Sequence, residues 1–239
     1  MDKFMKLVPV LLPLAVVVAL SFPVLALGVR FGWWGLALAL PLLAGAALTA
    51  AIMLALAGVA VLLALRRQYR QATQQGIWVI LVLAVPVAMV FHFGLKASQV
   101  PVLYDIATTW DNPPPISSQR PPGANPPQSA ASNREPQQAF YPDLGPLTLA
   151  EDKAKVVARI QQVAAELGWQ VVAVDADLGL VEATDTTFWF GFVDDITVRA
   201  TGLAQGGTQV DVRSVSRVGK SDLGKNAERI RAFLAALRV

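Results

Sequence analysis

Three long runs of apolar residues occupy the first 95 positions of the chain, at 7–27, 34–65 and 77–95. About 20 apolar residues cross a hydrocarbon core of about 30 Å as a helix, so each run is long enough to span a membrane. The second run would reach about 48 Å as a straight helix, which exceeds that thickness. We therefore expect its spanning part near Pro41–Leu65, with residues 31–40 lying at the interface or extending the helix outward. The pattern predicts a three-helix transmembrane anchor over residues 1–99.

Basic residues are distributed unevenly around these runs. Lys3 and Lys6 precede the first run and three arginines lie in the loop 66–76, whereas the loop 28–33 and the end of the third run carry one basic residue each. Cytoplasmic loops of membrane proteins carry an excess of Lys and Arg. The pattern predicts a protein of the bacterial inner membrane whose N-terminus is cytoplasmic and whose C-terminal domain is periplasmic.

The first run has two interpretations. Its charged start and apolar centre fit a cleaved signal peptide as well as a membrane anchor. The run is longer than the apolar region of most signal peptides, and no clean Ala-x-Ala cleavage site follows it. We therefore expect an uncleaved anchor.

Residues 100–146 are predicted to form a proline-rich linker. The stretch 101–146 holds 11 of the 16 prolines of the chain, among Ser, Asn and Gln residues. Because proline interrupts helix interiors and favours the extended polyproline II conformation, we expect a semi-rigid tether that holds the following domain away from the membrane. Recognition of the prolines by a partner protein is the alternative. Around Val102–Thr109 the chain is more apolar, which indicates a short strand.

Residues 147–239 show the pattern of a soluble α+β domain. Thr148 and Glu151 form a capping-box sequence, which predicts a helix that runs to Leu167. A second helix is predicted after Ser221, which we expect to cap it, with Asp222 at its positive end. Between the helices lie four strand-like segments whose short connections favour antiparallel pairing: Trp169–Val174, Leu178–Thr184, Phe192–Thr201 and Thr208–Val218.

This order of elements predicts a two-layer α+β sandwich, in which both helices cover one face of an antiparallel sheet. In the last hairpin, alternate apolar residues such as Ile196 and Val212 share the core face. A three-residue turn at 205–207 would place Asp195 opposite Arg217 on the other face. We expect that face, which carries Asp and Arg residues, to be open to solvent or to a partner.

The charge of the chain narrows the function classes. Residues 1–99 carry seven basic residues and one acidic residue, whereas residues 100–239 carry 13 basic and 16 acidic residues. The sequence pI of about 9.4 therefore reflects cations that flank the membrane, and we expect no nucleic-acid partner. The chain has no cysteine and a single histidine, His92, near the outer end of the third run. We expect no metal and no cofactor, with His92 as an interfacial residue.

Four stretches of the second half carry a resemblance. They are Asp211–Ile230, Ala183–Asp195, Tyr141–Asp143 with Pro146 and Leu147, and Asp105–Ile106 before Asn112–Pro114. Together they resemble the signature of an uncharacterised bacterial family, domain of unknown function 1499, over roughly residues 102–238. Some members of this family carry three membrane spans before the domain, so the resemblance implies the same architecture for the whole chain. The family has no established activity, so the resemblance implies no catalytic residues.

Polar residues are concentrated between the last predicted strand and the last helix. Each has a structural explanation, as a cap of the helix, a charge at its positive end, or a tie between helix and sheet. The functional alternative is an anion site at the N-terminus of that helix, with a strand arginine nearby. An aromatic run between two strands adds a tryptophan suited to packing, to a membrane edge or to ligand stacking. The candidate ligand or partner surface is Trp189, Asp195, Arg213, Arg217, Ser221, Asp222, Asn226 and Arg229.

These observations favour one function over two others. We predict an accessory or interaction subunit of an envelope complex, with the lipid bilayer and a membrane or periplasmic protein as partners. A module that binds a lipid or other small amphiphile between sheet and helices, near Trp189, is the alternative. An enzyme has the least support: the chain has no Gly-x-Ser-x-Gly motif, the domain has no histidine, and Asp194 and Asp195 point to opposite faces of a strand.

Overall fold

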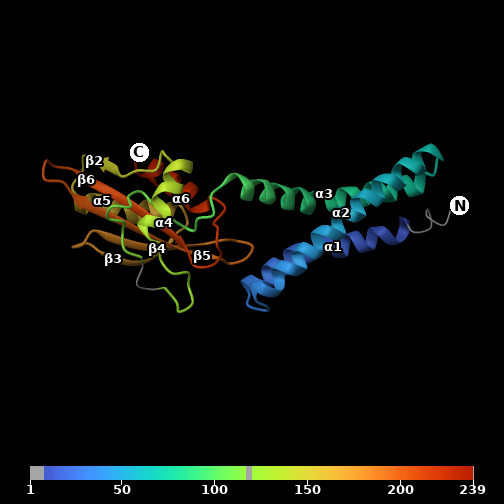
Figure 1. Cartoon of the computed structure of the whole chain (residues 1–239), viewed down its shortest axis with the longest axis horizontal. Helices are drawn as coiled ribbons and strands as arrows, with labels where there is room; N and C mark the ends of the chain where they lie inside the picture. The colour runs from blue at the N-terminus through green and yellow to red at the C-terminus, as the bar shows by residue number, and fades with distance from the viewer. Residues whose placement is uncertain (1–7, 117–119, 239) are drawn as a thin grey trace. The chain divides into compact units, whose positions relative to one another are not determined.

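The computed structural model describes residues 8–116 and 120–238 of the 239-residue chain (Figure 1). The chain divides into two compact units: one holds the residues up to Lys96 together with Trp189–Gly191, and the other holds the remaining residues from Ala97 onward. The first unit contains three long helices, and the second contains a β-sheet with shorter helices. Each unit has a hydrophobic core of its own.

The three apolar runs form helices, as predicted, and all three are long and apolar enough to cross a membrane. The second helix begins at Leu36, so residues 36–40 extend it outward. The basic residues Lys3 and Lys6 lie outside the described residues. The helices are α1 (Val8–Arg30), α2 (Leu36–Arg66) and α3 (Arg70–Gln99).

Small residues line the contacts among these three helices. Ala15, Ala50 and Ala57 are fully buried. At Gly76 of α3, an added Cβ would lie 2.5 Å from the side chain of Val61 on α2. Helices in lipid associate through close packing rather than through the hydrophobic effect, so small residues at these positions let the backbones approach one another.

The second unit is built on an antiparallel sheet, which has six strands within the described residues. The strand order is β1-β6-β5-β4-β3, and β2 pairs with β6 as well. The four predicted strands form, and β1 lies within 102–109, where a short strand was expected, whereas β2 was not predicted. The strands are β1 (Asp105–Ala107), β2 (Leu147–Leu149), β3 (Gln170–Asp175), β4 (Leu180–Thr186), β5 (Val193–Gly202) and β6 (Thr208–Ser216).

Helices α5 (Lys153–Glu166) and α6 (Lys225–Leu237) cover one face of this sheet, as predicted. Their apolar stripes recur every three or four residues, which places those residues on one side of each helix. The stripes pack on the apolar residues of β4, β5 and β6, and the Trp169 ring stacks on that of Phe233 at 5.0 Å. The core contains Val156, Ile160, Val163, Ile196, Val198, Val212, Ile230 and Phe233.

The predicted capping box is wrong. Residues 147–149 form strand β2, and their backbone pairs with residues 208–210 of β6. A residue whose backbone belongs to a sheet ladder cannot start a helix, so Thr148 is not a cap. Helix α5 begins four residues later than that pattern implies, after Asp152.

Residues 100–146 do not form the expected extended tether, because parts of this segment are folded into the domain. They contribute β1 and the 11-residue helix α4 (Ala130–Phe140), and Leu103 and Ile106 belong to the core of the domain. Ser129 caps α4 by accepting a hydrogen bond from the N–H of Ser132. Only one of the prolines of the segment lies inside this helix, so the high proline content of the segment did not prevent a helix after Ser129.

The sheet face opposite α5 and α6 was expected to be open, and this expectation is wrong. The charged side chains of Asp195 and Arg213 on this face are buried. Arg213 donates hydrogen bonds to the backbone carbonyls of Pro114 and Gln128. Residues on both sides of the undescribed positions 117–119 therefore cover this face.

The register of the last hairpin also differs from the prediction. Gly202 pairs with Thr208, so the loop spans residues 203–207 rather than three residues, and Asp195 pairs with Val215. Arg217 lies beyond the end of β6, but its long side chain reaches back to the carboxylate of Asp195. The predicted ion pair forms, although the two residues are not cross-strand neighbours.

Candidate functional site

A group of polar side chains is buried between the sheet and α6, and we call it the helix-side network. At its centre, the Arg229 side chain is only 3 % exposed. Its Nη2 lies 2.6 Å from Asp194 Oδ2 and 2.7 Å from Asp185 Oδ2, and its Nη1 donates to Ser214 Oγ at 3.1 Å and to Asn226 Oδ1 at 2.5 Å. The network therefore consists of Asp185, Asp194, Ser214, Asn226 and Arg229.

The strand pairing explains why this arginine is needed. Asp185 on β4 and Asp194 on β5 are direct cross-strand partners. Two carboxylates in such positions repel each other, and burial of Asp194 strengthens that repulsion. Arg229 reaches both carboxylates from α6, so the helix can dock on the sheet only when the guanidinium neutralises them.

Asn226 connects three parts of the domain. Its Oδ1 accepts from Ser214 Oγ at 2.7 Å, and its Nδ2 donates to Ser216 Oγ at 3.0 Å and to the carbonyl of Tyr104 at 3.1 Å. These bonds join α6, β6 and the residue before β1. Because the amide is fully buried, each lost bond would leave a desolvated polar atom without a partner.

The N-terminus of α6 is occupied by a carboxylate of the chain itself. Asp222 accepts hydrogen bonds from the N–H groups of Gly224 and Asn226, each at 2.8 Å. Burial raises the pKa of Asp222 and the nearby Asp194 acts in the same direction, while the two backbone N–H groups and Arg229 oppose that rise. The N-cap residue of α6 is Gly224, so Ser221 does not cap the helix as predicted. The Asp222 carboxylate, two residues before the N-cap, fills the position that the anion-site alternative required.

A second group of charged residues lies on the opposite face of the sheet, and we call it the loop-side network. Arg213 forms two hydrogen bonds with the carboxylate of Asp105, at 2.9 and 2.7 Å, and its guanidinium lies 5.5 Å from the centre of the Trp110 ring. The Asp105 side chain is fully buried. The network consists of Asp105, Trp110, Arg120, Asp195, Arg213 and Arg217.

Asp195 receives two arginines within this network. Arg217 donates to it through Nε and Nη2, the closer contact being 2.6 Å. Arg120 Nε lies 2.9 Å from Asp195 Oδ2, but with poor hydrogen-bond geometry. The Asp195–Arg217 pair predicted from sequence therefore exists, and it is buried beneath the segment that supplies Arg120.

The outer edge of β1 is covered by side-chain amides of α4, which sequence reasoning missed. Gln137 accepts from the N–H of Ala107 at 3.1 Å and donates to the carbonyl of the same residue at 2.7 Å, as a neighbouring strand would. Asn133 donates to the carbonyl of Asp105 at 2.6 Å. An edge strand exposes unpaired backbone groups, and these two amides satisfy them in β1.

Tyr141 and Asp143 both contact Arg231 of α6. These two residues belong to one of the stretches that resemble domain of unknown function 1499. The guanidinium lies 5.2 Å from the centre of the Tyr141 ring and donates to Asp143 at 2.6 and 2.7 Å. The hydrogen bond from Arg231 lowers the pKa of Asp143. Burial, and then the charge of Asp222, raise the pKa of Tyr141. This motif fastens the end of α4 to the outer side of α6.

Trp189 lies apart from both networks. It belongs to the tip that joins β4 and β5, where Thr187 and Phe192 form the last hydrogen bonds of the hairpin. Its side chain is exposed, as is that of Phe188. The structure therefore separates Trp189 from the other seven candidates. Those lie in or beside the two networks and the start of α6.

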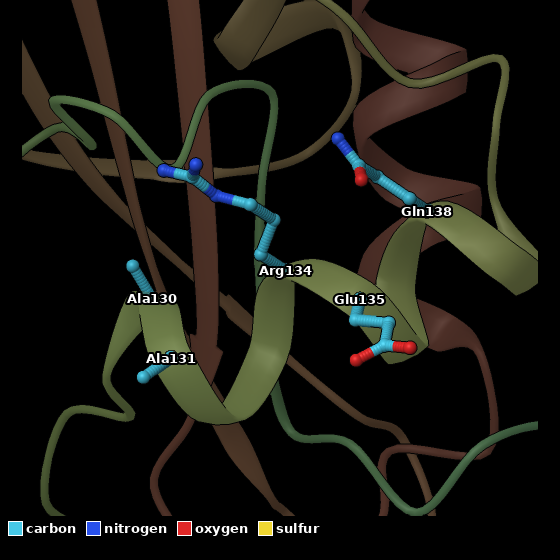
Figure 2. A pocket seen from close by; sticks show the side chains of 5 residues that line it. All are labelled: Ala130, Ala131, Arg134, Glu135 and Gln138. Atoms are coloured by element: carbon cyan, nitrogen blue, oxygen red, sulfur yellow. The ribbon is translucent and has the colours of Figure 1, made fainter.

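The surface hollows of the described part of the domain include the following two. One, of about 400 Å³, lies along α4, and Figure 2 shows the side chains of Arg134 and Gln138 leaving the helix in the same direction beside it. The other, of about 250 Å³, lies beside the helix-side network and includes Asp185, Arg229 and Trp169 in its lining. Among the described residues, no group of three or more His, Cys, Asp or Glu side chains gathers as a metal site.

The fold and the buried networks define a class: a two-layer α+β domain with internally paired charges, attached to three apolar helices of membrane-spanning length. The chain belongs to the family described as protein of unknown function DUF1499, which matches residues 105–237. Because the match begins at Asp105, the conserved domain of this family includes most of the proline-rich segment. No curated protein matches the chain.

Proposed function

We propose that the protein is a membrane-anchored interaction module, an accessory subunit of an envelope complex whose domain lies on the periplasmic side of a bacterial inner membrane. The observation that carries the proposal is the use of the charged side chains. Both networks pair their arginines and carboxylates inside the fold, at distances of 2.6–2.9 Å. These pairs hold the sheet, α6 and the segment before α5 in one arrangement, which suits a domain that presents a fixed surface to a partner.

The distribution of basic residues supports the proposed orientation. Arg66, Arg67 and Arg70 lie at the turn between α2 and α3, whereas Lys96 is the basic residue of the last turn of α3. An excess of Lys and Arg marks the cytoplasmic side. With the turn between α2 and α3 in the cytoplasm, the C-terminal domain is periplasmic.

Fusion reporters test this orientation. Alkaline phosphatase, which folds to an active enzyme only in the periplasm, is expected to be active when fused after Val239. The matched control is a fusion after Gln68, in the turn between α2 and α3, which is expected to be inactive there and to support a cytoplasmic reporter instead. The reverse pattern at the two positions would overturn the proposed topology.

Purification from native membranes tests the interaction role. The tagged full chain, extracted with a mild detergent, is expected to carry one protein partner in stoichiometric amount, identified by mass spectrometry. A tagged unrelated protein with three spans serves as the control for non-specific membrane proteins. Pure protein that carries a single lipid or metabolite would instead support the binding-module alternative.

The structure bears on that alternative. Its predicted ligand position was between the sheet and the helices near Trp189, but Trp189 lies at the tip of a hairpin. The sheet–helix interface is filled by core side chains such as Phe233 and Ile160. An amphiphile would therefore need a site other than the one first considered.

A further inference from the structure

The β4–β5 hairpin ends in an unusual tip. Its sequence is Phe188-Trp189-Phe190-Gly191, between Thr187 and Phe192. The Phe188 side chain is 68 % exposed and that of Trp189 is 43 % exposed. Large aromatic side chains at a loop tip are costly in water, whereas Trp in particular is enriched at the interface between lipid and water.

The pairing of the strands shows which end of the sheet carries this tip. Asp105 of β1 pairs with Val215, Val215 pairs with Asp195, and Asp195 pairs with Thr184. This row crosses the sheet at the point where the chain enters β1. The hairpin continues beyond the row to its tip, which adds about 10 Å at the usual rise of a strand. The entry of the chain and the aromatic tip therefore lie at the same end of the sheet.

The connection from α3 is short. Five residues, 100–104, separate the end of α3 from β1, and when fully extended they span at most about 18 Å. Leu103 already belongs to the domain core, which shortens the free connection further. The end of the sheet where the chain enters is thereby kept within reach of the membrane that α3 crosses.

Other exposed apolar residues occur at this end. Val102 precedes β1 and Val218 follows β6, and both side chains are exposed. Lys220, in the connection from β6 to α6, is exposed as well. Apolar side chains flanked by a cation match the chemistry of a lipid surface with anionic headgroups.

We propose that the tip Phe188–Gly191 inserts into the lipid interface of the membrane that the three helices cross. The aromatic rings occupy the headgroup region, and Val102 and Val218 lie at the same surface. The proposal holds for either side of the membrane, so it does not depend on the orientation proposed above.

The absence of cysteine allows a direct test with single-cysteine chains. Phe188→Cys places a probe at the tip, and Leu178→Cys places a matched probe at the β3–β4 turn, at the opposite end of the sheet, where the side chain is 64 % exposed. Each full-length chain is labelled with an environment-sensitive fluorophore and reconstituted in phosphatidylcholine–phosphatidylglycerol vesicles, with and without nitroxide-labelled lipid. Circular dichroism of the two labelled chains checks that both keep the fold.

We expect the probe at position 188 to show a blue-shifted emission and a loss of intensity with nitroxide lipid. The probe at position 178 is expected to show neither change. Equal emission and equal quenching at both positions would overturn the proposal. A blue shift at 188 without quenching by the lipid label would also overturn it, because the tip would then be covered by protein.

Discussion

Replacement of Arg229 by methionine is expected to lower the free energy of unfolding of the domain by about 3–5 kcal/mol, the usual cost of removing one partner of a buried ion pair. Methionine keeps much of the volume of the side chain but removes the charge that neutralises Asp185 and Asp194. Asp194 would remain buried without a cation, next to its cross-strand partner Asp185. Denaturant unfolding of the full chain in detergent, followed by tryptophan fluorescence, measures the effect.

Arg231→Met provides the matched control on the same helix. Arg231 also pairs with an aspartate at 2.6 Å, but both side chains are largely exposed, at 40 % and 55 %. An exposed pair contributes about 0–1 kcal/mol. Similar losses in the two variants would show that the helix-side network does not stabilise the domain as its burial implies. If Arg229→Met does not accumulate, Arg229→Lys keeps the charge and is expected to have an intermediate loss.

Replacement of Asp105 by asparagine is expected to cost about 3–5 kcal/mol as well, because it leaves the guanidinium of Arg213 buried without its anion. Asparagine has nearly the same shape as aspartate, so the change removes charge without creating a cavity. The Asp105 carboxylate also accepts from the N–H of Gln128, so the proline-rich segment loses one attachment. Denaturant unfolding, together with limited proteolysis of residues 108–140, measures both consequences.

Asp111→Asn is the control for this second prediction. Asp111 lies in the same segment and forms an ion pair with Arg134 at 2.6 Å, but its side chain is 85 % exposed. It is expected to change stability by less than about 1 kcal/mol. Unchanged protease resistance in Asp105→Asn would contradict the view that the loop-side network fastens this segment to the sheet.

The features that were predictable from sequence are those set by local patterns. The three helices of membrane-spanning length could be predicted from the apolar runs, because length and hydropathy decide whether a helix can cross a membrane. The central strands and both core helices follow from periods of two and of three to four residues, as the buried positions of Ile196 on β5 and Ile230 on α6 show. The predicted sandwich with two helices on one face is confirmed on this basis.

The features that were missed depend on partners far away in the chain. The Asp and Arg residues of β5 and β6 alternate with apolar residues, as on a sheet face that is exposed to solvent. This face is buried instead, because Arg213 pairs with Asp105, which lies 108 residues away in the sequence. Thr148 matched a capping box, but pairing with Gln209 made it a strand residue. Apolar residues in the proline-rich segment, such as Leu103 and Trp110, were the available signal that this segment is folded.

The double use of β6 has a consequence for how the domain is made. Both β1, at the start of the domain, and β2, about a third of the way along it, attach to the same edge of β6, which is synthesised after them. Contacts of such large sequence separation form slowly, since the entropy of closing a long loop is lost before the contact contributes. β1 and β2 therefore have no partner strand until β6 has been synthesised. A chain that ends before β6 would leave β1 and β2 without a partner strand, and the Asp105 carboxylate without Arg213. Such a chain would be degraded by quality-control proteases rather than work in part.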